Sequence, residues 1–328
     1  MNKLKLVSRF IILFAFLFIG ASLYLILEKD TSSVSHKIFA KGNNLSEKII
    51  FLSDTQSPIW VETLILDRNN NESARDKIFS EVLSTKPKAV FHFGDLVAFG
   101  FSNSDWSSVD KFTETLSDSG IEFYPTLGNH ELFLYPKVGE NNFISRFPSY
   151  SKTGYSVIKG SLAIILLNSN FSNLEEEQIL EQQEWYKKEL LKLDNDSTIS
   201  SIIVGSHHPP FTNSTIVNPN DDVKEKFVPP FISSNKCKIF LSGHSHAFEH
   251  FHYEGKDFLV LGGSGGLQQP LSVGNAAKWK DIYNSDTKLR RFHYVELSNE
   301  KDSLVFTVKM LSKDSSKFND EYQLKLEI

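Results

Sequence analysis

The sequence predicts an α/β fold, and two patterns carry that prediction. Short runs of Ile, Val, Leu and Phe recur from Ile49 onward, and each closes on polar or glycine-rich residues, which is typical of buried strands. Segments with the composition of helices separate several of these runs, so strands and helices alternate along the chain. In such folds functional groups gather on loops beyond the carboxyl ends of the strands. The residues that follow each run are therefore the candidates for chemistry.

Seven apolar runs are expected to form strands, and they are KIIFLSDTQ (48–56), AVFHFGDLV (89–97), IEFYPTLGNHE (121–131), LAIILLNSN (162–170), SIIVGSHHPP (201–210), KIFLSGHSH (238–246) and DFLVLGGSGG (257–266). Helices are expected at 73–84, 107–116 and 173–193. The last of these has Asn173 as a candidate N-cap, Glu in its first turn and Lys near its end, the order that the helix dipole favours. Near the C-terminus, RRFHYVEL, SLVFTVKML and YQLKLEI predict antiparallel hairpins.

The N-terminus carries a run of 18 residues without a charge, Phe10 to Leu27, preceded by Lys and Arg residues. At about 1.5 Å per residue, a helix of this length just crosses a bilayer core, and the basic residues place its start in the cytoplasm. We expect a basic stub and signal-anchor at 1–29, a polar linker at 30–48 and one domain at 49–328, held in a periplasmic or extracellular space. The alternatives are a buried core helix or a cleaved signal peptide, which would give a secreted protein.

Composition excludes several classes of protein. A hydrophobic fraction of 40% with 23% charged residues describes a folded chain rather than a disordered one. The net charge of −5 gives no basic excess, so no nucleic-acid-binding surface is evident. The single cysteine, Cys237, cannot form an intramolecular disulfide, a cysteine-rich zinc site or an iron–sulfur site. Any metal must therefore bind to histidine, carboxylate or amide groups.

Five of the expected strand ends carry such groups. Each residue alone has an ordinary explanation as a turn or cap residue, but their joint appearance at strand ends predicts a metal site. The seven candidate ligands are Asp54, Gln56, Asp95, Asn129, His207, His244 and His246. Seven donors are enough for two divalent ions if one carboxylate is shared, and Asp95 is the natural bridge.

Two of these pairs, Asp54 with Gln56 and His244 with His246, have i, i+2 spacing. Alternate residues of an extended segment do not converge on one point without a turn, which we expect at Ser53–Gln56 and at Gly243. Between two such cations a bridging water loses a proton near neutral pH, and the resulting hydroxide attacks phosphorus directly. The inventory therefore favours phosphoester hydrolysis.

In this order, the motifs Asp54-Thr-Gln56, Gly94-Asp95, Gly128-Asn-His-Glu131, His207-His-Pro209 and Gly243-His-Ser-His246 resemble those of the calcineurin-like metallophosphoesterases. That superfamily includes purple acid phosphatases and cyclic nucleotide phosphodiesterases. The resemblance implies a four-layer α/β/β/α sandwich. It also implies one metal on Asp54, Gln56, Asp95 and His246, and another on Asp95, Asn129, His207 and His244.

The resemblance further implies a metal-dependent phosphoric ester hydrolase acting on phosphate monoesters, diesters or a pyrophosphate. His130 would be catalytic, protonating the leaving oxygen or holding the phosphate, with Asn129 and His208 also binding substrate and Glu131 supporting the loop. The two ions would be Mn, Fe or Zn. Two departures stand out: Gln56 replaces a histidine, and Val97-Ala98-Phe99 offers no tyrosinate ligand, which argues against a purple iron centre.

Two other functions remain open. A catalytically degenerate, membrane-tethered scaffold would need no metal. A serine hydrolase would use Ser264 of Gly262-Gly-Ser-Gly-Gly266, with Asp281 or Asp286 and His293 completing a triad.

Substrate identity is left open by the sequence. Residues 98–106 and 132–155 are the expected walls of the substrate site, and Arg146 would bind a second phosphate or form a surface ion pair. The expected substrate is a phosphorylated small molecule or a lipid head group.

Overall fold

The computed structural model describes residues 47–283 and 286–328. The predicted signal-anchor and most of the predicted linker lie outside these residues. Among the helices of the described ranges, none combines the length and apolar character needed to cross a bilayer.

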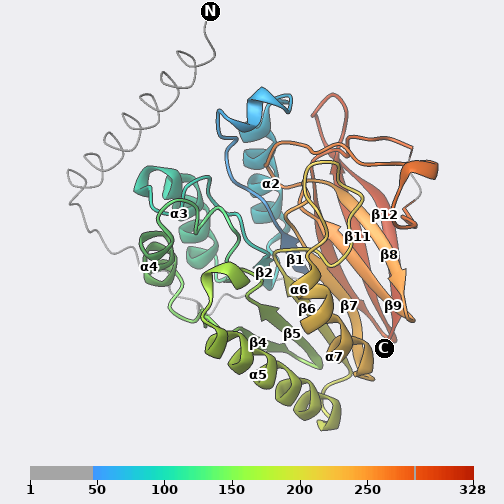
Figure 1. Ribbon diagram of the computed structural model, residues 1–328. Coiled ribbons are helices and arrows are strands. Elements are labelled where there is room, and N and C mark those ends of the chain that lie inside the picture. Colours follow the sequence, from blue (N-terminus) through green and yellow to red (C-terminus); the bar gives the residue numbers. More distant parts are fainter. Residues whose placement is uncertain (1–46, 284–285) are drawn as a thin grey trace, which may run out of the picture. The chain divides into compact units, whose positions relative to one another are not determined.

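Two six-stranded mixed sheets form the centre of the domain (Figure 1). The first has the order β12-β11-β10-β1-β2-β3 and the second β4-β5-β6-β7-β9-β8. The strands of the first are β1 (Ile49–Leu52), β2 (Ala89–His92), β3 (Glu122–Pro125), β10 (His293–Glu300), β11 (Ser303–Leu311) and β12 (Phe318–Glu327). Those of the second are β4 (Tyr155–Lys159), β5 (Leu162–Leu167), β6 (Ser201–Ser206), β7 (Cys237–Ser242), β8 (Phe248–Tyr253) and β9 (Lys256–Leu261).

Within each sheet a parallel block carries the predicted motifs. Strands β1, β2 and β3 run parallel, as do β5, β6, β7 and β9. The remaining strands pair antiparallel and extend the sheets outward. The predicted C-terminal hairpins are confirmed, because β10, β11 and β12 pair in sequence order.

Helices cover the outer faces of both sheets (Figure 1). They are α2 (Asn71–Thr85), α3 (Asn103–Asp118), α4 (Pro136–Arg146), α5 (Glu176–Asn195), α6 (Asp221–Lys226) and α7 (Val228–Ser233), with 3-10 turns η1 (Glu62–Leu64), η2 (Phe171–Asn173) and η3 (Gly274–Ala276). Three apolar cores result: one between the first sheet and α2, α3 and α4, one between the sheets, and one between the second sheet and α5, α6 and α7. Four layers around three cores are the predicted α/β/β/α sandwich.

Strand β1 shows why the strand sequences are apolar throughout. Ile50 and Leu52 pack into the helix-side core, while Ile49 and Phe51 pack into the core between the sheets. Because both faces are buried, the strand has no polar alternation. The same condition explains LAIILL in β5, where all six residues are buried.

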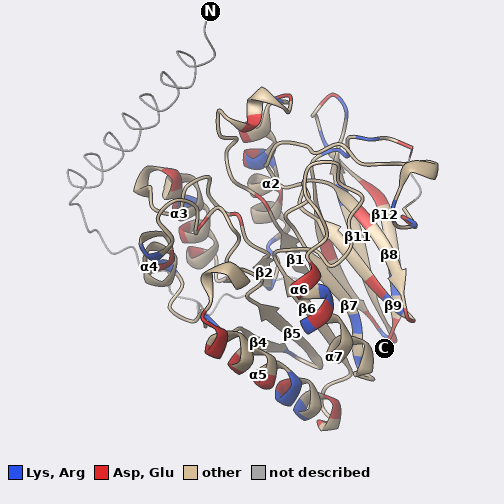
Figure 2. Ribbon diagram, in the orientation of Figure 1, with Lys and Arg blue, Asp and Glu red and all other residues tan. Residues whose placement is uncertain are grey.

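One local prediction needs correction, and several elements were not predicted. The long helix does not begin at Asn173, which lies in η2, but is capped by Glu175 through a reciprocal capping box with Gln178. Its acidic start and basic later turns are as expected (Figure 2). The strands β4 and β8 and the helices α4, α6 and α7 were not predicted. In β8, the polar residues Glu249 and His250 are buried and interrupt the apolar pattern on which the prediction depended.

Phe51 should be a main contributor to the stability of the core between the sheets. It is fully buried and its ring centroid lies 5.8 to 6.1 Å from those of Phe91, Phe93 and Phe306. We expect Phe51→Ala to lower the free energy of unfolding by about 3 to 5 kcal/mol, measured by chemical denaturation of the full chain. The control is Leu191→Ala on α5, where the side chain is 65% exposed and the change should stay within about 0.5 kcal/mol. Equal effects of the two substitutions would contradict this packing.

Candidate metal centre

The structure brings all seven predicted ligands to one edge of the sandwich, where the carboxyl ends of the parallel strands in both sheets meet. Asp54 follows β1, Asp95 follows β2 and Asn129 follows β3, while His207 and His244 follow β6 and β7. The residues form two groups. Ligand atoms of Asp54, Asp95 and His246 lie within 4.8 Å of one another, and so do those of His207, His208 and His244.

Asp95 stands between the two groups. Its Oδ1 accepts a hydrogen bond of 2.8 Å from the backbone N–H of His130, and its Oδ2 lies 3.2 Å from Nε2 of His207. This Oδ2 is buried and accepts no hydrogen bond. Burial alone would raise the pKa of Asp95, but the neighbouring charges of His207 and His130 outweigh it and hold the pKa far below its ordinary value. Asp95 is thus a carboxylate with one oxygen directed at the centre.

One group surrounds Asp95 with His207, Asn129 and His244. Nε2 of His207 lies 3.0 Å from Oδ1 of Asn129 and 3.2 Å from Nδ1 of His244. The other ring nitrogen of His207 lies 2.8 Å from the carbonyl oxygen of Phe93, a contact that fixes the orientation of the ring. Burial would lower the pKa of His207, but Asp95 raises it to about 9.

The second group joins Asp95 to Asp54, His246 and Gln56. Nε2 of His246 lies 3.4 Å from Oδ1 of Asp54, and its Nδ1 lies 2.7 Å from the carbonyl oxygen of Leu267. The side-chain amide of Gln56 is 3.1 Å from Nε2 of His246. Asp95 thus contacts both sets of residues that the family resemblance implied as ligands, and the assignment of the seven residues to two metals stays a prediction.

The candidate ligands converge because three of them turn the backbone at their own positions. Asp54, Asp95 and His244 adopt left-handed conformations, with φ of 59°, 55° and 64°, which are strained for residues other than glycine. The expected turn at Gly243 is therefore one residue too early. Gly243 is needed for a close approach instead, because a Cβ there would lie 1.9 Å from Oγ of Ser53 and 2.4 Å from Oδ2 of Asp54.

His130 is held at the entrance to this centre. Its backbone N–H donates to Asp95, and its Nδ1 lies 3.0 Å from the carbonyl oxygen of Ala98. The ring therefore turns Nε2 toward Oδ2 of Asp95 and Oε1 of Glu62, each 3.9 Å away. Glu62 was not predicted, since it lies in a segment without periodicity or a motif.

Glu131 supports the loop, as the sequence suggested. Its buried carboxylate accepts backbone N–H bonds from Asp95 at 2.9 Å, Leu96 at 2.7 Å, Val97 at 3.2 Å and Gly128 at 2.7 Å. Burial and the charge of Asp95 raise the pKa of Glu131 to about 7, while the N–H donors oppose that shift. One side chain thus joins the loops that carry Asp95 and Asn129.

His208 lies beside His207 and His244 and shares a group of candidate ligand atoms with them. Its Nδ1 is 2.8 Å from Oγ of Ser169, and its ring centroid is 4.5 Å from that of His244. Burial, with the nearby His207, lowers the pKa of His208 to about 3, so the ring is neutral at physiological pH. Ser169, which follows β5, is a partner that only the tertiary structure reveals.

Two residues considered from the sequence are not placed for the roles suggested. Oγ of Ser264 is fully buried and donates to the backbone carbonyl of His293, while Nδ1 of His293 contacts the carbonyl of Arg291. The side chains of Ser264 and His293 do not pair with each other, so the serine hydrolase hypothesis is wrong. Arg146 is buried and bound to Asp110 at 2.8 and 3.1 Å, so it is a structural ion pair and not a phosphate ligand.

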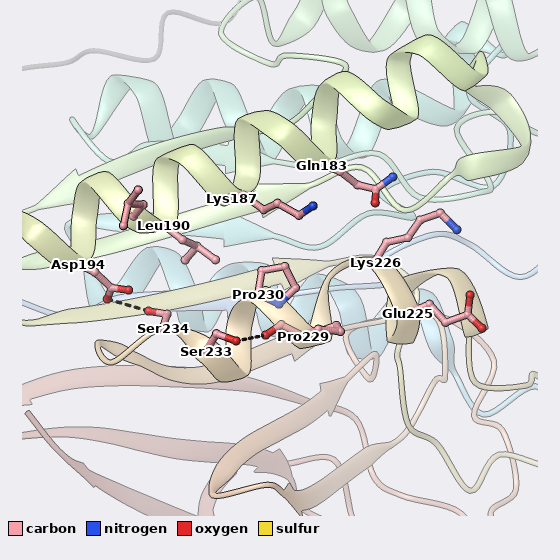
Figure 3. Close-up of a pocket in the computed structure, with 11 residues that line it drawn as sticks. Gln183, Lys187, Leu190, Asp194, Glu225, Lys226, Pro229, Pro230, Ser233 and Ser234 are labelled. Atoms are coloured by element: carbon pink, nitrogen blue, oxygen red, sulfur yellow. Dashed lines mark hydrogen bonds between the residues drawn. The ribbon is translucent and has the colours of Figure 1, made fainter.

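A hollow on the helical surface lies away from these residues. It occupies about 510 Å³ between α5 and the α6–α7 segment, and Lys187, Leu190 and Pro230 are among its lining residues (Figure 3). Oγ of Ser234 donates to Asp194 across one end of it at 2.8 Å. None of the predicted ligands lines this hollow, so we assign it no role in the metal centre.

The donor set fits a pair of divalent cations. Its carboxylate and amide oxygens and imidazole nitrogens are ligands that Mn, Fe and Zn accept. Oδ2 of Asp95 is buried without a hydrogen-bond partner, and its ion-pair neighbours are His207 at 3.2 Å and His130 at 3.9 Å. A cation bound nearby would offset the cost of burying this charge.

Comparisons with known proteins agree with this geometry. Residues 47–248 match the family model of the calcineurin-like phosphoesterases. Purple acid phosphatase 15 of Arabidopsis thaliana is 27% identical over 191 residues, which cover 52% of this chain and 34% of that protein. The chain thus spans about a third of the length of this curated relative.

Solved structures share the fold. Purple acid phosphatase PPD1 from yellow lupin superposes with a TM-score of 0.61 at 16% identity, covering 88% of this chain and 55% of that one. GAP50, the anchor in the inner membrane complex of Plasmodium, gives a TM-score of 0.61 at 17% identity, covering 86% and 88%. A dimetal phosphatase from Danio rerio gives 0.56 at 13% identity, covering 87% and 99%. The family model covers more than half of the sequence, and the chain belongs to the calcineurin-like phosphoesterase family.

Proposed function

We propose that this protein hydrolyses phosphoesters with two divalent metal ions. One ion would be held by Asp54, Gln56, Asp95 and His246, and the other by Asp95, Asn129, His207 and His244. The observation that carries the proposal is Asp95, whose buried Oδ2 has no hydrogen-bond partner between the two groups of donors. When bound, such ions neutralise phosphoryl oxygens and lower the pKa of water.

The protein's own groups would orient the substrate and supply a proton. His130 directs Nε2 away from its contact with Ala98, which suits it to hold the phosphate or to protonate the leaving oxygen. Asn129 and His208 border the same space. Glu131 fixes the loops on either side of Asp95, so these groups keep their positions without rearrangement.

A metal-free scaffold is the competing function. The fold alone does not decide, because one protein with this fold is described as an anchor in a membrane complex. A scaffold would have no use for a buried carboxylate oxygen without a hydrogen bond or for three candidate ligand residues with strained backbone. The retention of all seven donors at one edge of the sandwich favours the enzyme.

We also propose that residues 10–27 anchor the chain in a membrane, with the domain outside the cytoplasm. In cells expressing the full chain, the protein should stay in the membrane pellet after alkaline extraction, and the domain should be cleaved by protease added outside the cytoplasmic membrane. Insertion of two Arg residues into the apolar run should release it, because each charge at a bilayer centre costs several kcal/mol. Release of the unaltered chain by alkali, or protection of the domain from external protease, would contradict this arrangement.

Metal binding should stabilise the folded chain. Saturation of one site at about 100 times its dissociation constant adds about 2.7 kcal/mol, so Mn²⁺ added to chelator-treated protein should raise the melting temperature by roughly 5 °C or more. Asp95→Asn keeps the side-chain shape and should remove most of that rise. Asp257→Asn is the matched control, since Asp257 contacts His250 at 3.0 Å and His252 at 2.9 Å outside the candidate centre. A full Mn²⁺ response in Asp95→Asn would refute the assignment of Asp95.

Hydrolysis and the role of His130 can be measured together. The Mn²⁺-loaded full chain should hydrolyse p-nitrophenyl phosphate or its bis ester, and failure on both would contradict the proposed function. His130→Gln should lower the rate on an alkyl phosphate by about 10² to 10⁴-fold. The loss should be smaller on p-nitrophenyl esters, whose leaving group needs no protonation. Equal losses on both substrates would assign His130 to phosphate binding instead.

A further inference from the structure

Two short segments beside His130 present large apolar side chains to solvent. We call them the apolar rim, and it consists of Trp60, Val61, Leu64, Ile65, Phe133 and Leu134. Trp60, Leu64 and Ile65 are the most exposed, at 66%, 72% and 77%. The rim supplies six of the fifteen large apolar side chains that are exposed in the described part of the chain. Exposed large apolar side chains gathered on segments near a site are typical of an interaction surface.

The rim is continuous with the candidate metal centre. From one segment, Oε1 of Glu62 lies 3.9 Å from Nε2 of His130, while the backbone N–H of Ile59 donates to its other oxygen at 3.0 Å. From the other, the ring of Phe133 lies 6.4 Å from that of His130 and 6.0 Å from that of Phe99. His130, which we propose to protonate the leaving group, therefore lies between the two segments of the apolar rim.

A hollow of about 430 Å³ lies beside the apolar rim. Its lining combines apolar residues, among them Pro58, Trp60, Val97 and Phe99, with polar ones that include Arg75 and Asp105. Ala98 lines it too, and the carbonyl oxygen of Ala98 contacts His130. A substrate with an apolar portion next to its phosphoester could therefore place the two parts in adjoining spaces.

We propose that the apolar rim rests on a lipid bilayer and that the substrate is a phosphoester lipid presented there; the hydrolytic part rests on the proposed function. Trp, Phe and Leu are the side chains that enter the boundary between head groups and acyl chains. The predicted anchor ends at Leu27, and 21 residues separate it from β1 at Ile49. A random-coil chain of that number of residues has an average end-to-end distance of about 25 Å, so the predicted linker would hold the domain within reach of the membrane surface.

Tryptophan fluorescence tests the docking step without any activity. All four Trp residues lie within 47–328, and Trp60 is far more exposed than the fully buried Trp106. With the full chain in phosphatidylcholine vesicles, brominated acyl chains should quench the fluorescence, and Trp60→Phe should remove most of the quenching. The double variant Leu64→Ser/Ile65→Ser should also reduce it. Leu180→Ser/Leu191→Ser on α5, with side chains of 57% and 65% exposure, is the matched control and should retain it.

Hydrolysis tests the substrate class. We expect the full Mn²⁺-loaded chain to hydrolyse long-chain phosphatidic acid or phosphatidylcholine in vesicles. The ratio of that rate to the rate on the dibutyryl lipid, which stays monomeric, should fall about tenfold or more in Leu64→Ser/Ile65→Ser. The α5 double variant should keep the ratio of the unaltered chain.

Three outcomes would overturn the proposal. Absence of quenching in the unaltered chain would show that the rim does not meet lipid, and a rim-dependent change in sedimentation mass would assign it to a second copy. An unchanged ratio in the rim variant would exclude lipid presentation as the role of the surface. If the unaltered chain hydrolyses neither lipid nor p-nitrophenyl esters, the proposed function fails, and quenching still decides whether the rim docks on the bilayer.

Discussion

Two buried carboxylates, Asp54 and Asp95, are the constraint on which the rest of the site depends. Both side chains are fully buried, and burial of unpaired charge is among the largest costs in a protein interior. Part of the compensation comes from backbone N–H groups, because His244 donates to Asp54 and His130 donates to Asp95. The backbone of one site residue thus fixes the side chain of another. Removal of one ligand would disturb the position of its neighbour.

The same constraint explains the strained backbone. Left-handed residues other than glycine cost about 1 to 3 kcal/mol each, and Asp54, Asp95 and His244 all have this conformation. Each follows a strand that is buried in a sheet of the sandwich, so the surrounding core fixes the conformation. Glycines then remove the remaining obstacles, as at Gly128, where a Cβ would lie 2.1 Å from Oδ1 of Asp95. The two sheets therefore provide the rigidity that lets oxygen and nitrogen donors face one another.

The central strands could be predicted from the sequence because burial on both faces leaves an uninterrupted apolar run. The convergence of the seven candidate donors followed from their positions at the ends of these runs. The edge strands β4 and β8 of the second sheet were not predicted, because polar residues interrupt their apolar pattern. In β8, His250 is buried but contacts Asp257 of β9 and Tyr322 of β12, so other strands satisfy its polarity. The sequence also did not predict which residue adopts the left-handed conformation, since the turn lies at His244 and not at Gly243. The Gly-rich motif at Ser264 suggested a catalytic serine that the structure does not support. Gly263 is required there because the ring of His293 fills the space that a Cβ would need, a contact that the motif alone does not reveal.

The metal centre and its surroundings depend on different physical conditions. Toward the interior, every donor follows a strand and is fixed by short hydrogen bonds, so the chemistry is determined by residues that leave recognisable motifs. Toward solvent, the neighbours of His130 are Glu62, from a 3-10 turn, and Phe133, from a loop. Neither residue is part of a periodic pattern, and neither is required for the strands to pair. Residues in these loops can therefore differ without disturbing the candidate ligands at the strand ends, so membership of the family indicates the class of reaction more closely than the molecule that enters the site.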